Sequence, residues 1–291
     1  MTSIANNESG HARFRVPRIV LAVGSGLVVG LTAANVWPLL LVGFGMPVAG
    51  ILEAGFLALY FWWASGHAVP ASLKQARREA FRATQLTRAQ WLFGIAAAMV
   101  FALTVHAALV VLFRLVPFPA ALFHRDYQLG MNMALPLKWA AVVVAAASAA
   151  ICEETGFRGY MQKPIETRHG AVTAIAISSV LFAVFHLSKS WAIFGMVPIV
   201  LGAGVLLGLI AWASNSLIPG IIGHTVMDMG MFGYWWTGLA GTFGARTIAV
   251  TGIDFPFLLA CAVLVAGLAI TLLLIAKLRA ITAESPRLSR E

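Results

Sequence analysis

Three short segments of the sequence place acidic, basic and imidazole groups inside otherwise apolar runs. Their ionisable residues are Glu153, Glu154, Arg158, His186, His224 and Asp228. An ionisable side chain inside a bilayer costs about 2.5–3.5 kcal/mol on insertion scales, so each one needs a partner or a function. Carboxylates and imidazoles are also the common general acids and bases of enzymes. The pattern indicates either a proton-transferring site or a buried polar network.

The first segment, residues 150–159, reads Ala-Ile-Cys-Glu-Glu-Thr-Gly-Phe-Arg-Gly. Glu154 and Arg158 are four residues apart, which places them on one face of a helix where they can pair. Glu153 points about 100° away from Glu154 around the helix axis. We therefore expect Arg158 to neutralise one carboxylate, while the other faces a cavity and exchanges protons. The alternative is a structural network of two acids and an arginine.

The other two segments each contribute a histidine. His186 ends the run Phe182-Ala-Val-Phe-His186. A lone histidine on an apolar face is more often a satisfied interior side chain than a catalyst, and Phe182 is expected only to pack. His224 and Asp228 share one helix face. Asp228 could hold the His224 tautomer, help to bind a metal, donate a hydrogen bond if protonated, or simply join two helices.

A turn at His169-Gly170 would bring the first two segments together. Glu154 lies about 15 residues before this turn and His186 about 16 after it, which is about 22–24 Å of helix in each case. His224 lies about 12 Å beyond the Asn215-Ser216 turn, so it reaches the same level if the hairpin projects about 10 Å from the bilayer. On this geometry the three segments meet.

The elements that carry these residues are membrane helices. The chain has 291 residues, of which 60% are hydrophobic and only 11% are charged. A soluble globular chain is about 45–50% apolar and about 25% charged. This composition excludes a soluble enzyme, a disordered chain and a disulfide-stapled secreted module. It also excludes nucleic acid as a partner despite the net charge of +9, because basic residues between membrane helices mainly set orientation.

A spanning helix needs about 20 mostly apolar residues. The expected spans cover residues 19–40, 47–65, 91–113, 137–163, 171–189, 191–213, 217–236 and 255–276. The first apolar run is too long for a signal peptide, so we expect an uncleaved first helix. The predicted fold class is therefore all-α, a polytopic membrane protein with about eight transmembrane helices in one bundle. Glu53, in the second span, is expected to pair with His106 or Arg114 from the third.

Basic residues set the expected orientation. The most basic segments are the N-terminal arm, the loop at 66–90 and the C-terminal tail, and eight spans place all three on one side, the cytoplasm. We expect the 66–90 loop to lie on anionic lipid headgroups. The expected organisation is an arm at 1–18, membrane helices with the basic loop at 19–135, a core at 136–236, and a last helix with a basic tail at 237–291.

The order Glu153-Glu154-x-x-x-Arg158, Phe182-x-x-x-His186 and His224-x-x-x-Asp228 resembles the CPBP family. This family contains the type 2 CAAX prenyl proteases and the bacteriocin-processing or immunity proteins called ABI proteins. The resemblance covers residues 136–236. It implies an eight-helix bundle with a conical cavity open toward the cytoplasm. It also implies hydrolysis of a peptide bond in a membrane-held substrate, either a peptide or a lipidated protein.

The resemblance also implies roles for individual residues. Glu153 and His186 would activate a water, Glu154 and Arg158 would support the site, and His224 with residue 228 would polarise the scissile carbonyl. The family more often has asparagine where this chain has Asp228, and an ionised aspartate would repel an oxyanion. Glu153, His186 and His224 would alternatively hold zinc with a water in an open position. The sequence has no His-Glu-x-x-His motif.

Two classes of function follow from these residues. The first is an intramembrane endopeptidase of the CAAX prenyl protease type 2 kind. The second is a non-catalytic membrane protein, which could be a transporter, a proton relay or an immunity-type scaffold. Transporters more often show paired repeats with broken helices, and this sequence shows no repeat. We expect an integral protein of a prokaryotic plasma membrane with both termini in the cytoplasm, and the oligomeric state stays open.

Overall fold

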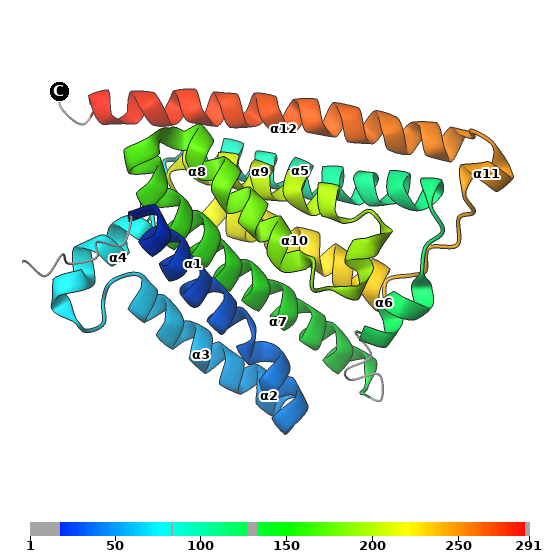
Figure 1. Cartoon of the computed structure of the whole chain (residues 1–291), viewed down its shortest axis with the longest axis horizontal. Helices are drawn as coiled ribbons and strands as arrows, with labels where there is room; N and C mark the ends of the chain where they lie inside the picture. The colour runs from blue at the N-terminus through cyan, green and yellow to red at the C-terminus, as the bar shows by residue number, and fades with distance from the viewer. Residues whose placement is uncertain (1–17, 83, 127–132, 289–291) are drawn as a thin grey trace, which may run out of the picture.

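The computed structural model describes residues 18–82, 84–126 and 133–288, and its regular elements there are all helical (Figure 1). The predicted arm lies almost wholly outside these residues. In chain order the α-helices are α1 (Arg18–Ala34), α2 (Val36–Phe44), α3 (Val48–Ala64), α4 (Lys74–Ala80), α5 (Arg88–Leu115), α6 (Ala120–Asp126), α7 (Leu135–Glu153), α8 (Lys163–His186), α9 (Val197–Ser214), α10 (Ile218–Gly230), α11 (Ile248–Thr251) and α12 (Phe255–Leu288). Short 3-10 helices, η1 (Ala71–Leu73) and η3 (Ser190–Phe194), and π-helices, η2 (Glu154–Gln162) and η4 (Met231–Trp236), complete the described part.

Five of the described helices are long and apolar enough to cross a membrane. They cover Arg18–Phe44, Arg88–Leu115, Leu135–His186, Val197–Ser214 and Phe255–Glu284, and Val48–Ala64 is a shorter apolar helix. The all-α membrane class is therefore confirmed, but the count of about eight spans is not. Two predicted spans, 137–163 and 171–189, belong to one continuous helical stretch. The predicted span at 217–236 divides into the 13-residue α10 and the π-helix η4.

The long stretch Leu135–His186 turns back on itself at Gly170. This residue has φ 82° and ψ 164° inside α8, a conformation that glycine adopts at little cost and other residues rarely adopt. The turn predicted at His169-Gly170 is therefore confirmed. After the turn, α8 packs against η2 and against α9. The fold-back brings the end of α8 beside the start of η2.

The helix after Glu153 is a π-helix rather than the expected α-helix, and α1 packs tightly against it. The contact is made by glycines, because a Cβ atom added at Gly156 would lie 2.5 Å from the Cα of Gly30 and 2.6 Å from the carbonyl oxygen of Gly26. Such small-residue pairs let membrane helices approach closely. Single π turns are common where a helix carries a functional site. The glycine contact therefore fixes the position of the segment that holds Glu154 and Arg158.

Gly156→Ala should weaken this helix pair measurably. The added methyl has no space, and overpacking costs typically about 1–3 kcal/mol of unfolding free energy. Thermal unfolding of the purified protein in detergent should show a lower Tm. Gly24→Ala is the matched control, because no atom lies within 4 Å of the position of its Cβ. Equal Tm values for the two variants would contradict the close α1–η2 contact.

Glu53 has a different partner from the one expected. It is buried on α3 and accepts a hydrogen bond from the Ser148 hydroxyl on α7. Arg114 instead donates to Asp254 at 2.7 Å, which joins the end of α5 to the start of α12 and lowers the pKa of that carboxyl. His106 accepts a 3.3 Å hydrogen bond from the indole of Trp235. The predicted pairing of Glu53 is wrong, because α3 packs against α7.

The basic 66–90 loop is only partly a surface segment. Lys74 and Arg78 on α4 are exposed, but Arg77 and Arg82 turn inward. Arg77 donates to the carbonyl groups of residues 68–70. Burial lowers the pKa of Arg82 and the adjacent Glu166 carboxylate opposes that shift. Arg77 and Arg82 are therefore buried in the protein and do not lie on lipid headgroups. The expectation that the whole loop lies there is wrong for these two residues.

Candidate active site

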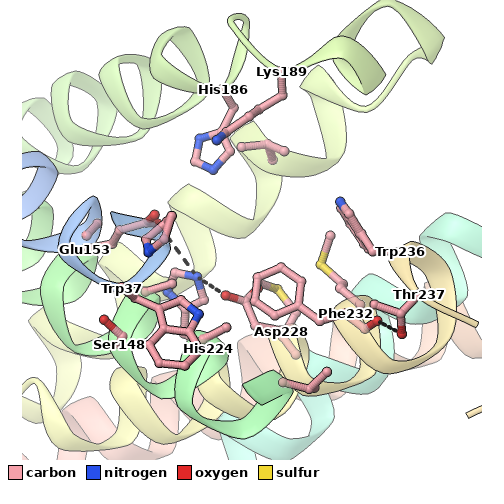
Figure 2. Close-up of a pocket in the computed structure, with 18 of the residues that line it drawn as sticks. Trp37, Ser148, Glu153, His186, Lys189, His224, Asp228, Phe232, Trp236 and Thr237 are labelled. Carbon is pink, nitrogen blue, oxygen red and sulfur yellow. Dashed lines mark hydrogen bonds and ion pairs between the residues drawn. The ribbon is translucent and has the colours of Figure 1, made fainter. Parts of the chain in front are cut away.

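The three polar segments meet within the bundle, as the hairpin geometry predicts. The end of α7 and the start of η2 carry Glu153, Glu154 and Arg158, while α10 carries His224 and Asp228. α10 packs against α7 and α5, which brings its histidine against the two glutamates. His186 ends α8 and reaches the same cavity from the opposite wall (Figure 2).

Three buried side chains, Arg158, Glu154 and His224, contact one another in sequence beneath the cavity. Arg158 Nη1 lies 3.1 Å from Glu154 Oε1, so the predicted i,i+4 pair is present. The same carboxylate oxygen lies 2.9 Å from His224 Nδ1. Arg158 and Glu154 are both 0% exposed and His224 is 2% exposed. Glu154 thus links the guanidinium to the imidazole and fixes the ring of His224, a link that sequence spacing does not reveal.

Phe182 contributes more than the packing expected of it. The Arg158 guanidinium lies 4.4 Å from the centroid of its ring, a cation–π contact. Its ring centroid is also 4.5 Å from that of His186 and 6.1 Å from that of His224. Arg158 completes its contacts by donating to the Gly204 carbonyl at 3.3 Å. The Phe182 ring therefore lies between the arginine and both histidines.

Glu153 and Asp228 face a cavity of about 570 Å³, together with the other nitrogen of His224. His224 Nε2 lies 3.9 Å from Glu153 Oε2 and 3.6 Å from Asp228 Oδ2, and Figure 2 shows these contacts as dashed lines. Glu154 does not line this cavity. The predicted division between a neutralised carboxylate and a cavity-facing carboxylate therefore holds in the geometry.

The backbone fixes the tautomer of His186. Its Nδ1 lies 2.7 Å from the carbonyl oxygen of Phe182. A carbonyl oxygen can only accept, so Nδ1 carries the hydrogen. In the neutral ring Nε2 then has the lone pair and can take a proton. Figure 2 shows the ring pointing into the cavity beside the Lys189 amine. Lys189 was missed in the sequence, where only its place three residues after His186 could have drawn attention to it.

Much of the cavity wall is apolar. It includes Trp37, Leu41, Met133, Met196 and Leu239. This wall suits an apolar chain more than a polar solute.

The position of two cavity-lining residues can be traced along the helices. Met133 precedes α7, and the far end of that helix continues into η2, which packs against α4. Lys189 follows the end of α8, a helix that also packs against α4. The sidedness of the protein in the membrane stays a prediction.

The predicted zinc ligands Glu153, His186 and His224 all line the cavity. Within the described ranges, no group of three or more histidine, cysteine or carboxylate side chains is spaced to hold a metal ion. Nδ1 of both histidines is held, by Glu154 and by the Phe182 carbonyl, which leaves Nε2 as the nitrogen of each ring that could meet a ligand. In the arrangement that the structure describes, the set Glu153, His186 and His224 is not spaced as a metal site. Zinc stays a prediction, and the reaction below is derived from the protein's own side chains.

The fold and the site define a helical membrane protein with a buried carboxylate–histidine centre. Residues 135–230, about a third of the chain, match the family model described as type II CAAX prenyl endopeptidase Rce1-like. This match over the segment that carries the three motifs supports their resemblance to the CAAX prenyl proteases. Searches of curated proteins and of solved structures each found no match.

Proposed function

We propose that this protein is an intramembrane endopeptidase that hydrolyses a peptide bond in a membrane-held, CAAX-type substrate. One observation carries the proposal. A carboxylate, Glu153, and two imidazoles, His186 and His224, face one largely apolar cavity while an ion pair fixes the site from behind. Hydrolysis needs a base and a carbonyl polariser, and these residues supply both. The family match gives the reaction class.

In the first step Glu153 acts as the general base. It takes one proton from a water that also contacts His186, and the water oxygen bonds to the carbonyl carbon of the scissile peptide. His224 donates to Glu154 through Nδ1, so its protonated form also donates from Nε2 into the cavity. That donor would stabilise the negative charge on the carbonyl oxygen.

In the second step the tetrahedral intermediate collapses. The carbon–nitrogen bond breaks, and the proton held by Glu153 passes to the leaving nitrogen. The products are one amine and one new carboxyl group, so atoms and charge balance without a cofactor. Arg158 and Glu154 stay an ion pair throughout and act only by holding the His224 ring in place.

Asp228 is proposed to act on His224 through its charge rather than to contact the oxyanion, because its Oδ2 lies 3.6 Å from Nε2, which is beyond hydrogen-bond distance and leaves that N–H for the carbonyl oxygen. Asp228→Asn should therefore retain cleavage, since the amide oxygen keeps the contact and a negative charge near the developing oxyanion is removed. We expect kcat within about tenfold of wild type or above it. Steady-state cleavage kinetics measure this. A loss beyond about 100-fold would show that the Asp228 charge itself is required.

Metal removal tests the zinc prediction. Metal analysis of the purified protein, paired with a cleavage assay before and after dialysis against a chelator, gives a direct answer. Cleavage by metal-free protein at an unchanged rate would exclude an essential metal. Stoichiometric zinc with chelator-sensitive cleavage would instead make Glu153 or a histidine a metal ligand.

The proposed function is tested in proteoliposomes containing a prenylated peptide that ends in a CAAX sequence. Mass spectrometry should show one cleaved bond, and protein-free liposomes should leave the peptide intact. The rival function is transport or proton relay, which counterflow and pH-gradient assays on the same vesicles detect. Counterflow, with no cleavage of this or a related membrane-held peptide, would overturn the proposed endopeptidase function.

A further inference from the structure

A second cleft lies at the end of the bundle that carries α4, apart from the active-site cavity. It has a volume of about 630 Å³ and lies between α4, the following loop, the start of α8 and the α9–α10 turn. Its charged lining residues are Arg78, Glu79, Arg82, Lys163 and Arg168. Four of these five are cationic, so the cleft attracts anions.

Two of these cationic side chains already make hydrogen bonds within the protein. Arg82 donates to Glu166 at 2.5 Å and to the carbonyl oxygens of Arg158 and Ala211 at 3.1 and 3.2 Å. Lys163 donates to the Asn215 side chain at 2.9 Å. These contacts hold both cations against the protein, and the Glu166 carboxylate is engaged by Arg82.

The other two cations are available to a ligand. Arg78 on α4 and Arg168 on α8 are both exposed. In the part of the chain that the structure describes, neither side chain makes an ion pair or hydrogen bond. Glu79, the acidic lining residue, is held by a 2.9 Å hydrogen bond from Gln75. Arginine binds phosphate oxygens through paired N–H donors, which makes phosphate the anion that best fits two such forks.

Aromatic and basic residues mark the membrane surface at this end. The Arg77 guanidinium lies 5.5 Å from the Trp63 ring, and the Arg279 guanidinium lies 4.5 Å from the Trp212 ring. Tryptophan and basic residues concentrate at the headgroup level of membrane proteins. Trp212 is three residues from Asn215, which lines the cleft. These contacts support a position for the cleft near the headgroup level.

We propose that this cleft binds the phosphate group of an anionic phospholipid between Arg78 and Arg168. The site does not depend on the proposed peptidase function. It lies next to Arg82, whose backbone has φ 50° and whose guanidinium bonds the carbonyl of Arg158. A non-glycine residue rarely adopts this φ, so the three hydrogen bonds of Arg82 hold the loop in place. A bound lipid would strengthen the attachment of this loop to η2.

The test is native mass spectrometry of the full-length protein in detergent, titrated with phosphatidylglycerol, phosphatidylcholine or glycerol phosphate. Phosphatidylglycerol should bind at least about tenfold more tightly than phosphatidylcholine, because only the former keeps a net negative charge for the arginines. The double variant Arg78→Gln/Arg168→Gln should lose about 10- to 100-fold in phosphatidylglycerol affinity, the range expected for charge-assisted hydrogen bonds.

The matched control is Lys74→Gln/Lys277→Gln. It removes the same charge from two exposed positions outside the cleft. The affinity of this variant for phosphatidylglycerol should therefore stay within about threefold of wild type. Equal losses in the two double variants would overturn the site in favour of diffuse surface attraction. Binding of glycerol phosphate without binding of phosphatidylglycerol would show that the cleft takes a free phosphate ester. That result would overturn the proposed phospholipid ligand. All four substitutions are at exposed positions, so an unchanged Tm should confirm that each variant folds.

Discussion

Protein with Glu153→Gln should fold and insert normally but should cleave its substrate about 10²–10⁴-fold more slowly than wild type, the typical range for loss of a general base. Glutamine has nearly the shape of glutamate but cannot take a proton from water. The change leaves the buried Arg158–Glu154 ion pair intact and alters only the 3.9 Å contact of Glu153 with His224 Nε2. The side chain of Glu153 is 17% exposed to the cavity, so the amide can be accommodated. Initial cleavage rates in proteoliposomes measure the loss.

Cys152→Ser is the matched control for Glu153→Gln. Cys152 is the preceding residue, is 0% exposed and does not line the cavity. Its substitution should leave the rate near that of wild type. A Glu153→Gln protein that cleaves as fast as this control would remove Glu153 from the mechanism.

Arg158→Met should have the largest effect on stability. Removing one partner of a buried ion pair leaves the other charge uncompensated and typically costs about 3–5 kcal/mol. Here the unpaired charge would be Glu154, which is 0% exposed and must still hold His224. We expect a clear fall in Tm together with loss of cleavage, since the imidazole loses its fixed orientation.

The double variant Arg158→Met/Glu154→Gln separates stability from positioning. Neutralising both partners removes the uncompensated charge, so part of the lost Tm should return. Cleavage should stay low, because a neutral glutamine no longer supplies the negative charge that favours the protonated, donating form of His224. Thermal unfolding and cleavage rates of the single and double variants give both answers. A double variant that is no more stable than Arg158→Met would contradict a buried, mutually compensating pair.

Local spacing predicts much of this site. Four-residue separation places Glu154 beside Arg158, because neighbours on a helix face meet whatever surrounds the helix. Gly170 predicts the turn that folds α8 back, because its φ of 82° suits glycine. The charge-poor composition predicts the membrane class. The helix spacing and the turn together predict that Glu153 faces the cavity.

Contacts between distant segments are what the sequence does not reveal. The carboxylate of Glu154 meets His224, which is 70 residues away, only because α10 packs against α7. Phe182 has the pattern of a packing residue, and its contact with Arg158 depends on the same packing. The sequence does not identify the partner of Glu53, because several helices could pack beside α3. The π-helix after Glu153 likewise depends on the glycine contact with α1.

The central claim is that a water activated in this cavity attacks the peptide bond directly. It is tested most directly by a single turnover of a CAAX-type prenylated peptide in water enriched in oxygen-18, with product and protein masses followed together. The predicted result is one oxygen-18 atom in the new carboxyl group and an unchanged protein mass at every time point. A product without the label, or protein that transiently carries a peptide fragment, would contradict direct attack by water.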